Sequence, residues 1–176
     1  KIINKLRIKR EELGFFKSKQ AIKQELSKQV GKLKLYPVTS GAGYTTKYVV
    51  ASNKTYFLKV ANRYAEARIK RIATHSRHIY CERLLREYQV LRKLSKLNLS
   101  PKPILLGNTY LLMQYTPGPL LSDLLASKAP IKLKLKYLEK AFKAILKIHK
   151  AGIIFPDLSP TNIIIHKNQL KFIDFE

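Results

Sequence analysis

Apolar and polar positions follow different periods along this chain, and each period predicts a kind of element. In residues 1–31, apolar side chains such as Ile22 and Leu26 recur at helical spacing among lysines, and Gly31 is expected to end the helix. In residues 33–61 the period changes to short β-rich runs separated by turn residues, which is typical of an antiparallel meander. The expected strands are residues 34–39, 48–51 and 56–60.

Helical spacing returns in two longer segments, with two strands between them. The expected elements are a helix at residues 83–97, strands at 104–106 and 110–115, and a long helix at 130–152. One face of the long helix is formed by Leu135, Leu138, Phe142, Ile145 and His149. We interpret His149 as a core or interface histidine, because no metal-spaced partner accompanies it.

The end of the chain predicts a β-hairpin with polar side chains at its open end. The strands are expected at residues 163–165 and 170–173, around a polar turn at 166–169. Asn162 directly precedes the first strand and Asp174 directly follows the second, so they should lie side by side, with Asp157 on the loop beside them. Oxygen ligands for a hard cation, next to a carboxylate that can accept a proton, suit a phosphoryl-transfer site.

Taken singly, Asp157 could cap a turn and Asp174 could end a strand. Taken together, Asp157-x-x-x-x-Asn162, a hairpin and Asp174-Phe175 resemble the catalytic loop and metal-binding motif of the protein-kinase superfamily. The resemblance implies that Asp157 is catalytic and that Asn162 and Asp174 hold Mg²⁺ beside ATP.

Three residues depart from the usual kinase pattern. Pro156 replaces an arginine before the catalytic aspartate, Ser159 replaces a lysine, and Glu176 replaces the glycine of the metal motif. These departures place the sequence among the atypical kinases.

Lys59 interrupts an apolar strand, where a lysine needs a counterion if it is buried. On the helix at residues 83–97, Glu87 falls within the apolar stripe at 100° per residue, whereas Glu82 lies roughly opposite it. Glu87 is therefore the better partner. The resemblance implies a catalytic lysine–glutamate pair that holds ATP phosphates, and a purely structural salt bridge is the alternative.

The nucleotide pocket has weaker signals. Gly41-Ala42-Gly43 could drape over ATP phosphates, although a plain hairpin turn fits equally well. By resemblance to the kinase hinge, Met113 guards the back of the adenine pocket, and the backbone of Gln114, Tyr115 and Thr116 binds the adenine edge. Simple core packing is the alternative for Met113.

The expected fold is α+β and protein-kinase-like, with a small antiparallel-sheet N-lobe that includes one helix. A truncated, mainly helical C-lobe carries the catalytic hairpin. The expected domains are a basic helical N-terminal extension at residues 1–32, the N-lobe at 33–115 and a partial C-lobe at 116–176. Because the chain starts at Lys1 and stops within the metal motif, we expect a piece of a longer protein.

The catalytic loop most resembles the kinase domain of class III and IV lanthipeptide synthetases, which phosphorylates Ser and Thr of a precursor peptide. Rio-type kinases, the KEOPS-complex kinase and lipopolysaccharide core kinases are also similar. The resemblance implies an ATP- and Mg²⁺-dependent phosphotransferase acting on a hydroxyl group, with Ser or Thr of a protein or peptide preferred. The alternatives are a pseudokinase that docks RNA or a partner protein, and a sugar or lipopolysaccharide kinase.

The net charge indicates the kind of partner that the protein attracts, and the cysteine content indicates its cellular compartment. A net charge of +24 should attract anionic partners such as RNA, a membrane surface or an acidic peptide, although a solvated basic surface explains it equally well. The single cysteine, Cys81, excludes an intrachain disulfide and is compatible with a cytoplasmic location. No apolar run approaches the roughly 18 residues of a transmembrane helix.

Overall fold

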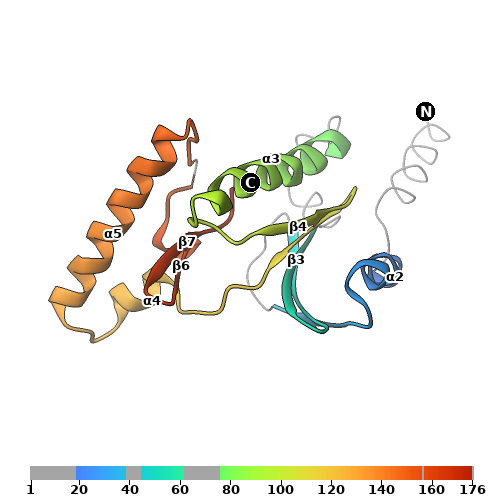
Figure 1. The fold of residues 1–176 in the computed structure, drawn as a ribbon, viewed down its shortest axis with the longest axis horizontal. Helices are drawn as coiled ribbons and strands as arrows, with labels where there is room; N and C mark the ends of the chain where they lie inside the picture. Colours follow the sequence, from blue (N-terminus) through green and yellow to red (C-terminus); the bar gives the residue numbers. More distant parts are fainter. Residues whose placement is uncertain (1–18, 39–44, 62–75, 156, 176) are drawn as a thin grey trace, which may run out of the picture. The chain divides into compact units, whose positions relative to one another are not determined.

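A computed structural model describes residues 19–38, 45–61, 76–155 and 157–175 of the chain (Figure 1). The fold is α+β, and the chain divides into two compact units. The first unit runs to Leu85 and includes Ile104–Met113, and the second comprises Arg86–Pro103 and the chain from Gln114 onward. In the described residues, no helix has both the length and the apolar character that crossing a membrane requires.

In the described part of the first unit, a five-stranded sheet has the order β1-β2-β3-β5-β4. The strands are β1 (Lys34–Pro37), β2 (Thr45–Ala51), β3 (Thr55–Ala61), β4 (Pro103–Leu106) and β5 (Tyr110–Gln114). Strands β1, β2 and β3 pair antiparallel, with Lys34 opposite Ala51 and Thr45 opposite Ala61. The predicted meander is confirmed.

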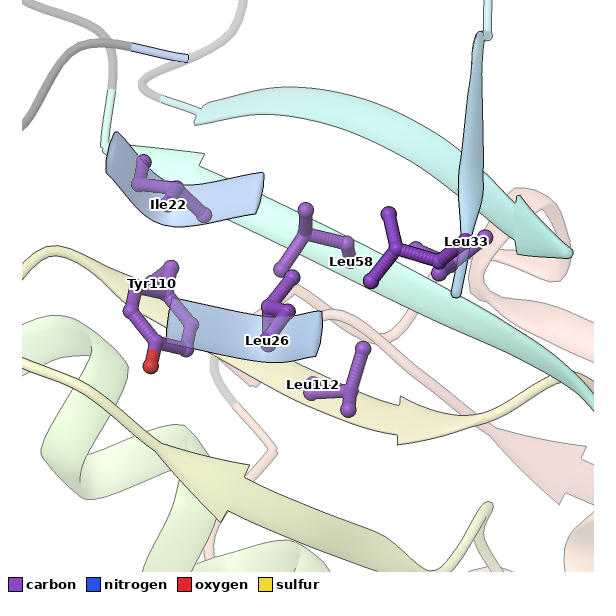
Figure 2. Close-up of a cluster of buried hydrophobic side chains, with 7 residues drawn as sticks. Ile22, Leu26, Leu33, Leu58, Tyr110 and Leu112 are labelled. Atoms are coloured by element: carbon purple, nitrogen blue, oxygen red, sulfur yellow. The ribbon is translucent and has the colours of Figure 1, made fainter. Parts of the chain in front are cut away.

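Helix α2 (Lys19–Val30) packs on this sheet and completes its core. Ile22 and Leu26 lie in one buried cluster with strand residues that include Leu58, Tyr110 and Leu112 (Figure 2). Burial of each aliphatic side chain contributes about 1.5–3 kcal/mol to stability. Helix α2 lies in the segment that the sequence assigned to an extension, and it is part of the core of the first unit.

Helix α3 (Ser76–Lys96) and the turn after α2 follow the predicted patterns. Leu84, Leu91 and Leu94 of α3 are buried, as the apolar stripe requires. Gly31 has φ 78°, and its N–H donates to the Ser27 carbonyl oxygen at 3.0 Å, so it ends α2 as expected.

The second unit contains the hairpin and the helices beside it (Figure 1). Its elements are α4 (Leu121–Ala126), α5 (Ile131–Lys150), the 3₁₀ helix η2 (Pro160–Asn162), β6 (Ile163–His166) and β7 (Gln169–Phe172). Lys167 and Asn168 both have positive φ, at 48° and 63°. The turn is therefore a two-residue type I′ turn rather than the four-residue turn expected from the sequence.

The buried face of α5 is not the one that the sequence predicted. Tyr137, Ala141, Ala144 and Ile148 are buried. Leu135 and Phe142, by contrast, are 57% and 63% exposed. His149 is exposed as well, so of its interpretation as a core or interface histidine the core role is wrong and the interface role stays a prediction. The small alanines allow the helix to approach β7 closely, and the Tyr137 hydroxyl donates to Asn168 Oδ1 at 3.0 Å.

Gly152 ends α5 in the predicted place. It has φ 71°, its N–H donates to the His149 carbonyl oxygen at 2.9 Å, and the N–H of Ile153 donates to the Ile148 carbonyl oxygen at 3.2 Å. This is a Schellman motif, and Ile148 and Ile153 are both buried. The motif directs the chain into the loop that carries Asp157.

The segment before α4 runs along β6 and needs a glycine. The N–H of Ile165 donates to the Pro119 carbonyl oxygen at 2.9 Å. Gly118 has φ 151°, and a Cβ at this position would collide with the Ile165 carbonyl oxygen. Only glycine therefore permits this approach.

Candidate active site

The open end of the hairpin brings Asn162 beside the residue that precedes Asp174. Ile163 lies opposite Phe172, and the N–H of Ile173 donates to the Asn162 carbonyl oxygen at 3.0 Å. This bond extends the antiparallel pairing one residue beyond the strands. The register therefore places Asn162 opposite Ile173, one residue before Asp174, so Asp174 lies one residue beyond the position that the sequence predicted for it.

Asn162 also holds Asp157. The Asn162 Nδ2 donates at 3.1 Å to both the backbone oxygen and the carboxylate Oδ2 of Asp157. Asn162 is only 8% exposed, whereas Asp157 is exposed. Because the amide nitrogen is engaged as a donor, the amide oxygen is the atom that could ligate a cation. In this contact the Asp157 carboxylate uses its Oδ2 atom.

Ser159 sets the path of the chain between these two residues. Its Oγ accepts from the N–H of Thr161 at 3.3 Å and caps η2, and its carbonyl oxygen accepts from the N–H of Asn162 at 2.9 Å. The N–H of Ser159 donates to the Asp157 carbonyl oxygen at 2.9 Å. Ser159 stands where the kinase pattern has lysine, and here it orders the loop.

Three aromatic rings pack together beside the segments that carry Asp157 and Asp174. The ring of Phe155 lies 4.5 Å from that of Phe175 and 5.9 Å from that of Phe172, measured between centroids. All three side chains are buried. Phe155 precedes Asp157 by two residues and Phe175 directly follows Asp174, so this packing fixes both segments. This cluster was not predicted from the sequence, in which its signal is an aromatic residue near each aspartate.

Asp174 has the left-handed conformation, with φ 68°. This region is unfavourable for most residues but is tolerated by Asp and Asn. The turn separates the Asp174 side chain, which is half-buried, from the buried ring of Phe175.

Lys59 and Glu87 are both buried, as the sequence predicted. Lys59 on β3 is 3% exposed and Glu87 on α3 is fully buried, whereas Glu82 is exposed. A buried charge requires a partner or a ligand. Lys59 and Glu87 belong to different units, and their pairing stays a prediction.

The structure constrains only part of the predicted nucleotide pocket. Met113 is buried, and the N–H of Gln114 donates to the Lys102 carbonyl oxygen at 2.8 Å. An adenine contact from the Gln114 backbone must therefore use its carbonyl oxygen. Tyr115 and Thr116 follow and are half-buried, while Gly41, Ala42 and Gly43 lie outside the described residues.

The residues at the hairpin end fit Mg²⁺ better than a transition metal. Among the described residues, no group of three or more His, Cys, Asp and Glu side chains is placed to hold a metal ion. Magnesium takes oxygen ligands and is commonly bound by one or two protein carboxylates together with phosphate oxygens and water. Asp174 and the amide oxygen of Asn162 match this requirement.

Comparison with known proteins identifies the family. Residues 34–176 match the RIO domain, and this span contains every candidate site residue. The chain belongs to the RIO domain family. This is one of the kinase-like groups that the sequence resembles, and its fold agrees with the predicted kinase-like α+β fold. The resemblance to lanthipeptide synthetases stays a prediction.

Two curated relatives match parts of the chain, and the second of them is named as a kinase. The chain is 32% identical over 97 residues to the KEOPS complex subunit Bud32 of Pyrococcus abyssi (strain GE5 / Orsay), covering 53% of this chain and 44% of the relative. It is 34% identical over 65 residues to the serine/threonine-protein kinase PknG of Mycolicibacterium smegmatis (strain ATCC 700084 / mc(2)155), covering 37% of this chain and 9% of the relative. The chain thus spans less than half of the length of these curated relatives.

Proposed function

We propose that this chain transfers the γ-phosphoryl group of ATP, with Mg²⁺, to a hydroxyl group, with Ser or Thr of a protein or peptide as the preferred acceptor. The observation that carries the proposal is the Asn162 side chain. It donates to the Asp157 carboxylate at 3.1 Å and is attached to the strand end that pairs beside Asp174. A candidate base and two candidate metal ligands thereby share one rigid end of the hairpin.

Asp157 accepts the proton of the acceptor hydroxyl group in this proposal. Its carboxylate is exposed, so an acceptor can reach it, and the Asn162 Nδ2 fixes its orientation. A positioned general base typically contributes a rate factor of about 10²–10⁴. Its other contribution is to direct the acceptor oxygen toward phosphorus.

Asp174 and the amide oxygen of Asn162 would hold the metal. When bound, Mg²⁺ would neutralise charge on the ATP phosphates. The left-handed turn at Asp174 and the buried ring of Phe175 keep this carboxylate at the strand end. The hydrogen bond from Ile173 to Asn162 keeps the two ligands at a constant separation.

Lys59 would hold the α and β phosphates, and Glu87 would keep the lysine protonated and oriented. The support for this role is that both side chains are buried within otherwise apolar elements. A buried cation and a buried carboxylate each carry a large desolvation cost when alone. Pairing would offset part of that cost.

The preference for a protein or peptide acceptor rests on the names of the two relatives. PknG is named as a serine/threonine-protein kinase and Bud32 as a KEOPS complex subunit, which favours a protein substrate or partner over a sugar. The net charge of +24 favours an acidic peptide or RNA as an additional partner. The rival function is a kinase-like module that binds nucleotide without transferring phosphate.

The test is transfer of labelled phosphate from γ-labelled ATP to a library of Ser- and Thr-containing peptides, with mass spectrometry of the products. We expect transfer in the presence of Mg²⁺ and none after chelation with EDTA. Labelling of sugars but not of peptides would show that the acceptor is a sugar rather than a protein or peptide. Nucleotide binding without transfer to any acceptor would support the binding module instead.

A further inference from the structure

A cleft lies in the second unit, which also carries the β6–β7 hairpin. It has a volume of about 520 Å³ and lies at the turn end of the β6–β7 hairpin, beside the end of α3 and the loop that follows. Its lining residues are Ser95, Lys96, Asn98, Ser100, Pro101, Lys102, Gln114, Thr116, His166, Lys167, Gln169 and Lys171. Four of these are lysines and none is Asp or Glu, so the cleft is cationic.

This cleft is separate from the catalytic end of the hairpin. Strands β6 and β7 are four residues long, which places their two ends about 10 Å apart at roughly 3.3 Å per residue. Asp157, Asn162 and Asp174 do not line the cleft. Gln114 and Thr116 do line it, although only their backbone groups are expected at the adenine edge. Side chains alternate along a strand, so the Gln114 side chain and the buried Met113 side chain point to opposite faces of β5.

Lys171 is a buried cation in this cleft, and among the described residues its hydrogen-bond partners are neutral oxygen atoms rather than carboxylates. It is 7% exposed, and its Nζ donates to the Asn98 carbonyl oxygen at 2.8 Å and to Asn98 Oδ1. Burial lowers the pKa of Lys171, because the ammonium has lost water that would stabilise its charge. Two neutral oxygen atoms compensate this loss only in part, so an anion in the cleft would gain a strong partner.

The groups around Lys171 are held in place before any ligand arrives. The Asn98 Nδ2 donates to Gln169 Oε1 at 2.8 Å, which ties the loop after α3 to the hairpin turn. His166 Nδ1 lies 2.7 Å from the Pro117 carbonyl oxygen, and because a carbonyl only accepts, this nitrogen carries the proton. The cleft is therefore preorganised, which reduces the entropic cost of binding.

We propose that this cleft binds a small, multiply charged phosphate-bearing anion, with Lys171 at its base and Lys102 and Lys167 at its edge. The four cations are all lysines, and no arginine provides the planar fork that favours bidentate binding of peptide carboxylates. The volume is in the range of small-molecule sites, about 300–1,000 Å³. Among the described residues that line the cleft there is no Phe, Tyr or Trp for base stacking, which disfavours single-stranded nucleic acid.

The test is calorimetric titration of the full chain with inorganic pyrophosphate, in buffer of fixed ionic strength without Mg²⁺. The double substitution Lys102→Ala and Lys167→Ala removes two exposed cations, so the fold should be unaffected. We expect it to weaken pyrophosphate binding by at least about tenfold. The matched control is Lys132→Ala with Lys136→Ala, which removes two exposed lysines of α5 and should change binding less than about twofold.

Lys171→Met keeps the length of the side chain, removes the charge and should also weaken binding by about tenfold. Equal weakening in the cleft and control variants would show non-specific attraction and overturn the proposal. Weakening by Lys59→Met without weakening by the cleft variant would place pyrophosphate in the nucleotide pocket and overturn it too. If a single-stranded oligonucleotide binds more tightly than pyrophosphate and this binding is lost in the cleft variant, the ligand of the cleft is nucleic acid and the proposal of a small anion is overturned.

Discussion

At the residue scale, the buried charges on β3 and α3 make the strongest case for nucleotide chemistry. Lys59 is 3% exposed and Glu87 is fully buried, each in an element whose neighbouring buried residues are apolar. A protein that needed only a stable core would be at least as stable with apolar residues at these positions. In the proposed function, binding of the ATP phosphates is what retains them.

The first prediction concerns this pair. Lys59→Met should weaken ATP binding, and adding Glu87→Gln should cost much less than Glu87→Gln costs alone, because its partner is already gone. The expected coupling energy is about 0.5–3 kcal/mol in a double-mutant cycle of ATP affinity. Additive effects of the two substitutions would reject the pairing.

The second prediction concerns Asp174, which we propose as a ligand of Mg²⁺. Asp174→Asn removes a negative charge that Mg²⁺ requires, so the rise in melting temperature produced by Mg²⁺ and ATP should disappear. Asp123→Asn is the matched control. The Asp123 Oδ2 accepts from the N–H of Leu120 at 3.0 Å, and an amide oxygen can replace it there. The control should keep the melting shift, and an unchanged shift in Asp174→Asn would count against this ligand.

At the element scale, two glycines provide a matched test of how the chain reaches the hairpin. Gly118→Ala places a Cβ against the Ile165 carbonyl oxygen and should destabilise the protein by more than about 2 kcal/mol. In Gly152→Ala the added Cβ meets no atom within 4 Å, so only the backbone φ of 71° is unfavourable for alanine. The expected loss of stability is about 1 kcal/mol. Urea unfolding would measure both, and equal losses would refute the close approach at Gly118.

Some elements could be predicted because local periodicity determines them. Glu87 falls on the buried stripe of α3 by helical geometry alone, and the strand ends place Asn162 next to Ile173. In α5 the same reasoning failed. The face with the largest side chains, including Phe142, is exposed, whereas the face with Ala141 and Ala144 is buried, because packing against β7 favours small residues.

The cationic cleft could not be predicted, because tertiary contacts create it. Lys171 looks like any lysine in a strand until the loop after α3 brings Asn98 over it. The same holds for Phe155 and Phe175, which meet only when the loop and the strand end are folded together. Helix α4 was missed as well, because only six residues form it and no clear period is visible over that length.

At the scale of the whole molecule, α5 leaves an apolar face uncovered in the described residues. Its exposed side chains include Ile131, Leu135, Leu138 and Phe142. Contiguous apolar surface of this kind promotes association. We therefore expect the chain of residues 1–176 to self-associate in sedimentation velocity experiments.

Leu135→Gln combined with Phe142→Gln should shift the chain toward monomer, because both side chains lie on the exposed apolar face. Lys132→Gln combined with Lys136→Gln changes exposed residues of the same helix and should leave association unchanged. A wild-type chain that stays monomeric and unfolds cooperatively at high concentration would contradict this account of α5.

In the proposed function the open end of the hairpin is a phosphoryl-transfer site, and the decisive measurement is the rate of phosphoryl transfer by Asp157→Asn. The substitution keeps the size of the side chain and removes the proton acceptor. We predict that transfer to a peptide hydroxyl group slows by roughly 10²- to 10⁴-fold while ATP affinity is unchanged. Transfer at the wild-type rate by Asp157→Asn would contradict the assignment of Asp157 as the base.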